Sequence, residues 1–383
     1  MPALAGSRDA TPVHLLRTEL VLRRLHRTIA PRFARAEPRD RALAFLRGLV
    51  LSAGRRTGAR LAEDAGEARP DGMQRLLTTA RWDADALRDD LRDIVVEHLG
   101  DPRAVLVLHE EGFAKKGDHS VGVEPQFSRS AGGVVNCQVA VFLTYAAPRA
   151  QAIIDRELYL PPRWARDPAR RALARVPAGV PFRGVGRLGL EMVGRALAAR
   201  TPAAWVAAEA PFGHDAELRR HLSAHGVPYV LGVRLAPGHR HGSGRSPRGV
   251  PGAVPAEVIA AIPPQDWRRT IAQDDPVRRH GVCHSARVPL GRPGGAGHAR
   301  WLLVRRDMRR TRVYVCAGPP STSLAELAEV ARRAEDAPRC AASARYEVGL
   351  DHYEVRLWRA WYRYITLALL AHAGVTLASD ASP

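Results

Sequence analysis

Ionisable side chains follow directly after two short apolar runs, at residues 104–108 and 204–208. His109 and Glu111 come after the first run, and Glu209 comes after the second. Carboxylates are good ligands for hard cations such as Mg²⁺, whereas an imidazole is a poor one. Of these side chains, the two glutamates therefore suit a hard divalent cation better than the histidine does.

Positive charge dominates the chain and comes almost entirely from arginine. The formal net charge is +19 and the isoelectric point is near 11.0, while the only two lysines are Lys115 and Lys116. Such a balance favours a polyanionic partner, with nucleic acid ahead of an anionic membrane surface. A genome of high GC content also fills protein surfaces with arginine, so charge alone leaves the function open.

The chain has the composition of a globular protein, since hydrophobic residues make up 46% of it. Its most apolar run, residues 365–373, is far shorter than the roughly 20 residues that a membrane-spanning helix needs. The first residues do not have the pattern of a secretion signal, and the four cysteines show no paired spacing. We therefore expect a cytoplasmic, nucleoid-associated protein with no membrane partner.

Residues 1–100 are predicted to be helical. The clearest helix begins after Asp83, which is suited to cap it, and ends at Gly100. Before it, residues 54–66 lead through Pro70 into another short helix, a pattern compatible with a helix-turn-helix. An ordinary three-helix packing unit fits the same pattern equally well.

From residue 101 onwards the sequence predicts an α/β fold, because apolar strand-like runs alternate with helical segments. Residues 236–299 interrupt this pattern with a stretch rich in Gly, Pro, Arg and His, which we interpret as an insertion. The core would then consist of residues 101–235 and 300–375. The expected strands are 104–108, 136–145, 151–160, 204–208, 227–233, 301–305 and 311–316, and the expected helices are 188–200, 217–225, 323–337 and 352–373.

Several ordered blocks resemble bacterial insertion-sequence transposases of the DDE type. The blocks are residues 32–39, 70–77, 81–85, 110–117, 120–123, 136–139, 155–161 and 348–356. They cover most of the chain, and the stretch from 236 to 299 matches least. The resemblance implies a ribonuclease H-like mixed sheet with flanking helices, preceded by an all-helical DNA-binding domain.

In that family, three carboxylates hold two divalent ions that assist phosphodiester hydrolysis and strand transfer. By resemblance, the two aspartates fall at His109 and Glu209, and the glutamate falls at Pro338. Glu209 keeps a carboxylate on a longer arm, whereas Pro338 offers no ligand and is expected to break its helix. All three family positions have therefore changed.

Neighbouring acidic residues are weak replacements for the lost ligands. Glu110 is expected on the opposite face of the strand from His109, and Glu111 on the same face but about 6.6 Å further along. We expect no bound metal. If a metal does bind, Glu209 and Glu111 are the candidate ligands. An active enzyme would use Mg²⁺ or Mn²⁺. A core histidine that fills the vacated position is the simplest account of His109.

Contact with double-stranded DNA does not require the metals, because neutralising phosphates supplies most of the affinity. We expect a DNA-binding protein derived from a transposase, catalytically inactive, and acting as a transcriptional regulator or accessory factor. The alternatives are an active transposase with a rearranged metal site and an architectural protein that assembles on DNA or on a partner. Whether it forms a homodimer is left open. The candidate DNA contacts are Arg55, Arg56, Arg75, Arg81, Lys115, Lys116, Arg345 and Arg356.

Overall fold

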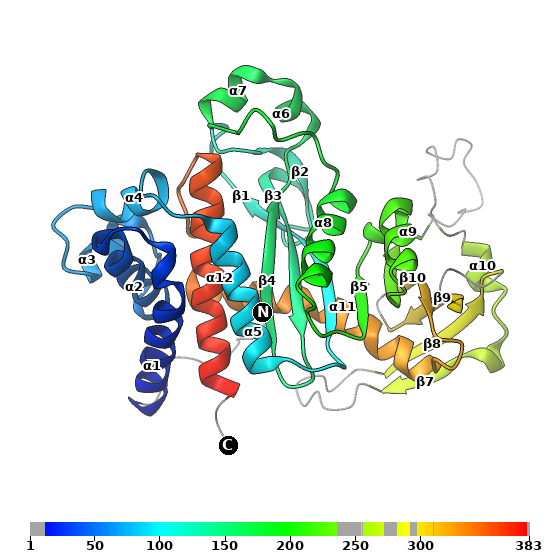
Figure 1. Ribbon diagram of the computed structural model, residues 1–383. Coiled ribbons are helices and arrows are strands. Elements are labelled where there is room, and N and C mark those ends of the chain that lie inside the picture. Colours follow the sequence, from blue (N-terminus) through cyan, green and yellow to red (C-terminus); the bar gives the residue numbers. More distant parts are fainter. Residues whose placement is uncertain are drawn as a thin grey trace.

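The computed structural model describes residues 12–235, 254, 256–271, 282–291, 297–308 and 310–380. It is an α/β structure in which a large mixed sheet is flanked by helices (Figure 1). Much of the predicted insertion, including residues 236–253 and 272–281, lies outside the described residues. No described helix is long and apolar enough to cross a membrane.

The N-terminal part is helical, as predicted. Its helices are α1 (Pro12–Ile29), η1 (Ala30–Arg32), α2 (Ala36–Leu51), α3 (Gly58–Asp64), α4 (Asp71–Thr78) and α5 (Ala84–Leu99). Asp83 caps α5 by accepting from the backbone N–H of Asp85 and Ala86, and Gly100 ends the helix. Helices α3 and α4 form the predicted short pair, joined by residues 65–70.

The last helix of the chain, α12 (Trp358–Asp380), packs among these N-terminal helices (Figure 1). Its Arg363 is almost completely buried and donates to the carbonyl oxygens of Ala80 and Trp82 at 2.6 and 2.7 Å. At the other end of α12, a Cβ added to Gly374 would meet Leu22 of α1 at 3.0 Å. The N-terminal helices and the C-terminal helix therefore share one hydrophobic core.

The sheet has the strand order of a ribonuclease H-like core. Strand β4 pairs with β3, β3 with β1, β1 with β5 and β5 with β6; the first two pairings are antiparallel and the last two parallel. Four further strands continue from β6 in the order β10, β9, β8 and β7. The strands are β1 (Val105–Ala114), β2 (Glu124–Ser128), β3 (Gly133–Ala146), β4 (Gln151–Leu158), β5 (Trp205–Ala208), β6 (Tyr229–Val233), β7 (Arg268–Ile271), β8 (Val282–Pro289), β9 (Ala299–Arg306) and β10 (Thr311–Gly318).

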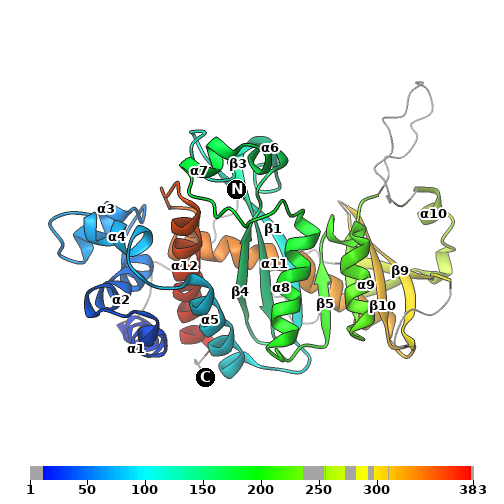
Figure 2. The ribbon, with the colours of Figure 1, turned by 45° about the horizontal axis from the view of Figure 1, so that its top comes forward.

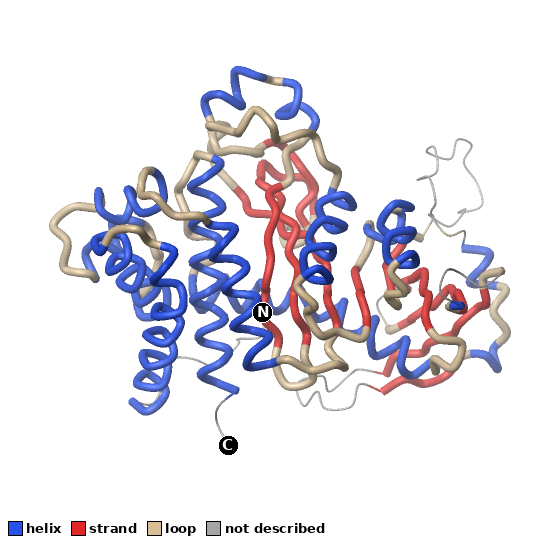
Figure 3. The backbone as a smooth tube through the Cα atoms, in the orientation of Figure 1, coloured by secondary structure: helices blue, strands red, loops and turns tan. Residues whose placement is uncertain are grey.

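Helices cover both faces of this sheet, as the tube in Figure 3 and the turned ribbon in Figure 2 show. Gly189 of α8 lies against Leu108 on one face of β1, whereas Val105 and Val107 on the other face pack with α11. The remaining helices are α6 (Pro162–Arg166), α7 (Pro168–Leu173), α8 (Val185–Ala198), η2 (Phe212–His214), α9 (Ala216–Ala224), α10 (Ala256–Ala260), η3 (Pro264–Asp266) and α11 (Leu324–Val348).

The structure differs from the sequence-based expectations in several elements. Strand β2 was not predicted, and β7 and β8, within residues 236–299, extend the sheet instead of standing apart from it. Helix α12 begins at Trp358 and not near His352. The expected break at Pro338 was wrong, because α11 runs through this proline to Val348. Buried alanines hold this helix against the sheet, and their packing outweighs the lost backbone hydrogen bond.

Candidate functional site: an altered metal-position edge

Two neighbouring parallel strands bring the first two family positions together. The last paired residues of β1 and β5 are Leu108 and Ala208. His109 and Glu209 follow them directly, so they lie side by side where β5 ends and β1 continues along β3. We call this region, with the strand end of β6 beside it, the metal-position edge.

His109 is part of the core. Its side chain is only 2% exposed, its Nε2 lies 3.0 Å from the hydroxyl of Thr144, and its ring packs against Phe142. The other ring nitrogen, Nδ1, has no hydrogen-bond partner among the described residues and lies 3.8 Å from a carboxylate oxygen of Glu111. The histidine therefore fills the first family position as a buried side chain hydrogen-bonded to a neighbouring strand.

The two glutamates after His109 have different neighbours. Glu111 accepts a hydrogen bond from Arg345 of α11 at 2.7 Å, and the same nitrogen donates to the carbonyl oxygen of Gly112 at 2.9 Å. Burial raises the pKa of Glu110, against the opposing effect of Arg129 and Arg234. Glu110 therefore shares the influence of Arg129 with Glu209, whereas Glu111 pairs with Arg345 of α11.

Glu209 is bound by an arginine from the β2–β3 hairpin. Nη1 of Arg129 contacts a carboxylate oxygen of Glu209, and Nη2 donates to the carbonyl oxygen of Ala210 at 3.0 Å. The hairpin tip reaches this point because it folds over β1, where Ser128 lies against Gly112. The carboxylate that survives at the second family position is thus already neutralised by a guanidinium.

Pro338, which the resemblance assigns to the third family position, lies on helix α11. Helix α11 packs against β1 and β5, and Arg345, two turns after Pro338, reaches Glu111 on β1. The acidic residues just before Pro338 on α11 are paired: Glu335 with Arg305, and Asp336 with Arg332. Helix α11 therefore presents a proline, and no available carboxylate, at this position.

These residues do not fit a pair of divalent ions. Of the three positions, one is a buried imidazole, one is a carboxylate bound to Arg129, and one has no donor atom. Within the described part of the chain, no group of three or more His, Cys, Asp or Glu side chains is placed to hold a metal ion. Two cations, Arg129 and Arg345, instead occupy the carboxylates nearest to the edge.

A cavity of about 360 Å³ opens beside this edge. It lies between the hairpin, the end of β6 and the start of β10, and three arginines line it. Sequence reasoning did not single out any of these arginines, because no spacing along the chain indicates that they converge. The cavity is lined by Arg129, Glu209, Ala210, Gly232, Val233, Arg310, Thr311, Arg312, Val313 and Tyr314.

The predicted DNA contacts separate into buried and exposed groups. Arg56 makes structural hydrogen bonds, since it donates to the carbonyl oxygens of Tyr346 and Glu347. Arg345 is bound to Glu111. Lys115 is half-buried over the ring of Tyr353. These three are less accessible than the sequence suggested. The exposed candidates are Arg55, Arg75, Arg81, Lys116 and Arg356.

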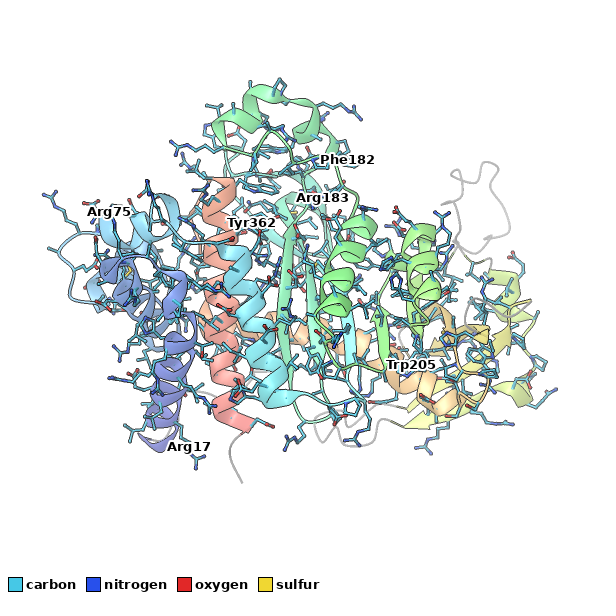
Figure 4. The ribbon with its side chains drawn as sticks, in the orientation of Figure 1. Arg17, Arg75, Phe182, Arg183, Trp205 and Tyr362 are labelled. Atoms are coloured by element: carbon cyan, nitrogen blue, oxygen red, sulfur yellow. The ribbon has the colours of Figure 1, made fainter. Side chains whose placement is uncertain are left out.

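One of the exposed candidates lies among the N-terminal helices. Arg75 lies on α4 among the N-terminal helices, where it is 3.4 Å from Glu37 (Figure 4). Arg55 lies close enough to Lys115 to lower the pKa of its ammonium group. The structure therefore brings Arg55 and Lys115 together and leaves Arg75 elsewhere on the helical part.

Comparison with known protein families gives one match. The profile of the DDE superfamily endonucleases matches residues 28–278, which is more than half of the chain. None of the curated proteins matches it. The matched region contains helices α2 to α10, strands β1 to β7, and both His109 and Glu209. Together with the ribonuclease H-like strand order, this match establishes that the chain belongs to the DDE superfamily endonuclease family.

Proposed function

We propose that this chain binds double-stranded DNA and has lost the two-metal cleavage chemistry of its family. The observation that carries the proposal is the Arg129–Glu209 pair, beside a buried His109. A metal ion at this edge would need Glu209 as a ligand, and would have to displace a guanidinium held close to it. The remaining positions supply no replacement carboxylate, so two ions would lack the anionic cage that they require.

The charge of the chain supports the DNA-binding half of this proposal. A net charge of +19 favours a polyanion, and exposed arginines on several elements are suited to phosphate contacts. A regulator or accessory factor needs such binding at a defined sequence. An architectural protein would bind without sequence preference or would require a partner chain, and competition between duplexes separates these two roles.

An active enzyme with a rearranged site is the competing proposal. It would need Glu110, Glu111 and Glu209 to converge on the same ions. Glu111 is bound to Arg345 and Glu209 to Arg129, and strand alternation places Glu110 and Glu111 on opposite faces of β1. Convergence would therefore require both strands and two ion pairs to rearrange, which makes this proposal the weaker one.

A plasmid-nicking assay with pure protein tests the loss of cleavage. Supercoiled DNA is incubated with Mg²⁺ or Mn²⁺, and we expect no nicked product above the level of a Glu209→Ala variant. Metal-dependent nicking that this variant abolishes would refute the proposal. A nicking activity that the variant retains would indicate a contaminating nuclease, and the preparation would be purified further and assayed again.

Salt-dependent binding to short duplexes tests the DNA-binding half. We expect the logarithm of the association constant to fall linearly with the logarithm of salt concentration, by about 0.9 for each neutralised phosphate. Arg81→Gln is expected to reduce the slope by about one, if Arg81 is one of the contacts. A protein that fails to bind any duplex at low salt would contradict the proposal.

A further inference from the structure

We propose that the metal-position edge has become a pocket that binds a phosphate group through arginine side chains, without a metal. The identification of DNA as the source of the phosphate rests on the proposed function. The existence of the pocket does not depend on it. The ligand class is a phosphate group, either a phosphodiester of DNA or the phosphate of a free small molecule. The cavity beside Glu209 is the site.

The first support is the placement of the arginines. Arg129 enters from the β2–β3 hairpin, and Arg310 and Arg312 enter from the start of β10, so the cavity has guanidinium groups on two sides. Arg129 is 44% exposed although its partner Glu209 is only 15% exposed. A side of this guanidinium therefore still faces solvent.

The second support is that Arg129 retains unused hydrogen-bond capacity. A guanidinium has five N–H donors in a planar fork, a geometry that matches two oxygens of a phosphate. Arg129 is described with one contact to Glu209 and one to the carbonyl oxygen of Ala210. These two anchors fix the orientation of the group and leave donors for a third partner.

The third support is the balance of charge around the cavity. Three arginines and one carboxylate line it, and Arg312 is held in position by Asp307 at 2.7 Å. Arg310 is exposed beside it, and Arg234, which acts electrostatically on Glu110, is also exposed. The residues that line the cavity itself, three arginines and one carboxylate, are net positive, which favours an anion over a cation. Outside this lining, Asp307 and Glu335 act on Arg312, and Glu110 acts on Arg129.

The proposal also accounts for the changed family positions. A divalent metal and an arginine are alternative ways to neutralise the same phosphate oxygens. Unlike a metal ion, a guanidinium does not have to be held by several carboxylates. Additional carboxylates at the site would compete with the phosphate for the arginine. Loss of the carboxylates at His109 and Pro338 removes negative charge from the edge, so it favours binding of phosphate by Arg129.

Calorimetric titration of the full-length protein tests the pocket directly. Inorganic phosphate and dimethyl phosphate are titrated in the presence of EDTA, so that no divalent ion contributes. We expect binding, and we expect Arg129→Gln and Arg310→Gln each to weaken it about tenfold or more, since each loses a charge-assisted hydrogen bond. Arg27→Gln on α1, an exposed arginine remote from the edge, is the matched control and should leave binding unchanged.

Glu209→Gln gives a result of opposite sign. Removing this carboxylate frees Arg129, so phosphate should bind more tightly, by several-fold. In a metal-dependent site the same change would remove a ligand and weaken phosphate binding. A second variant, Arg312→Gln, is also expected to weaken binding, which keeps the test decisive if one of the other proteins fails to fold.

The outcomes separate this inference from the proposed function. Failure of the wild type to bind phosphate in EDTA, or binding that Arg129→Gln and Arg310→Gln leave unchanged, overturns the pocket even if duplex DNA binds elsewhere. Binding of phosphate by a protein that does not bind any duplex supports the pocket and refutes the DNA proposal. A salt slope for duplex binding that falls in Arg310→Gln identifies DNA as the source of the phosphate.

Discussion

Arginine–carboxylate pairs occur in two regions of this molecule with very different surroundings. Under α12, Asp155 and Glu157 on β4 are buried and share Arg195 of α8, with both contacts at 2.9 Å. Tyr362 donates to Glu157 at 2.8 Å, and Arg183 lies 3.6 Å from the same carboxylate; both residues are labelled in Figure 4. We call this group the buried ion cluster. At the metal-position edge, by contrast, the guanidinium borders a solvent-filled cavity.

The difference in burial determines what each arginine can do. In the buried ion cluster every carboxylate oxygen depends on its partners, because an unpaired charge in the interior is costly. At the edge, solvent can replace the arginine, so the pair adds little to stability and its arginine remains available to a ligand. The same two functional groups therefore stabilise the fold in one region and are suited to binding in the other.

The largest expected effect comes from breaking the buried ion cluster. Arg195→Leu leaves Asp155 and Glu157 without their shared cation, and we expect a loss of about 3–5 kcal/mol in the free energy of unfolding. Denaturant titration followed by circular dichroism measures it. Arg187→Leu, an exposed position on the same helix, is the control and should change stability little. A loss in Arg195→Leu no larger than in this control would show that the cluster is not structural.

The next effect concerns the proline at the third family position. Pro338 lacks the N–H that would bond to the carbonyl oxygen of Ala334. Pro338→Ala should restore this bond and raise the free energy of unfolding by about 2 kcal/mol, less than the full cost of an interior proline because the unfolded chain gains freedom. Arg339→Ala on the same turn is the control. No stabilisation would mean that packing of α11 compensates completely for the missing hydrogen bond.

The sequence was sufficient for the strands of the edge but not for their pairing or chemistry. Apolar runs at 104–108 and 204–208 predicted two strands, and their parallel pairing became visible only in the structure. The alternation along β1 predicted that Glu111 would share a face with His109. The ion pair between Arg129 and Glu209 was not predictable, because it depends on how far the β2–β3 hairpin folds over β1. That curvature is a tertiary property with no local signal.

Helix α11 shows that a local sequence rule can also predict a feature that the structure lacks. The local rule that proline breaks a helix failed at Pro338, because Ala334, Ala337 and Ala341 are buried against the sheet on either side of it. Strand β8 was missed because its residues, which include Arg287, look like a polar loop until β9 pairs with them. In both cases long-range packing decided the conformation.

A smaller effect is expected from removing the arginine of the edge. Arg129→Leu should change the free energy of unfolding by no more than about 1 kcal/mol, because the side chain is largely exposed. A double-mutant cycle with Glu209→Leu isolates the pair, and we expect a coupling energy in the same range. A coupling above about 2 kcal/mol would place this pair with the buried ion cluster and weaken the argument that its arginine is available to a ligand.

The smallest expected effect is a dependence of DNA binding on pH. Burial lowers the pKa of Lys115 to about 8, with Asp351 and Arg55 acting in opposite directions on it. A phosphate favours the charged ammonium, so this contact is present below pH 8 and is lost as the pH rises through 8. Affinity for a duplex should fall by about threefold between pH 7 and pH 9, because one of several contacts disappears. Lys115→Met should remove this dependence, whereas Lys116→Met, at an exposed neighbouring position, should retain it. If the pH dependence persists in Lys115→Met, Lys115 is held over Tyr353 for the fold alone, and its half-buried charge belongs with the structural arginines rather than with the binding surface.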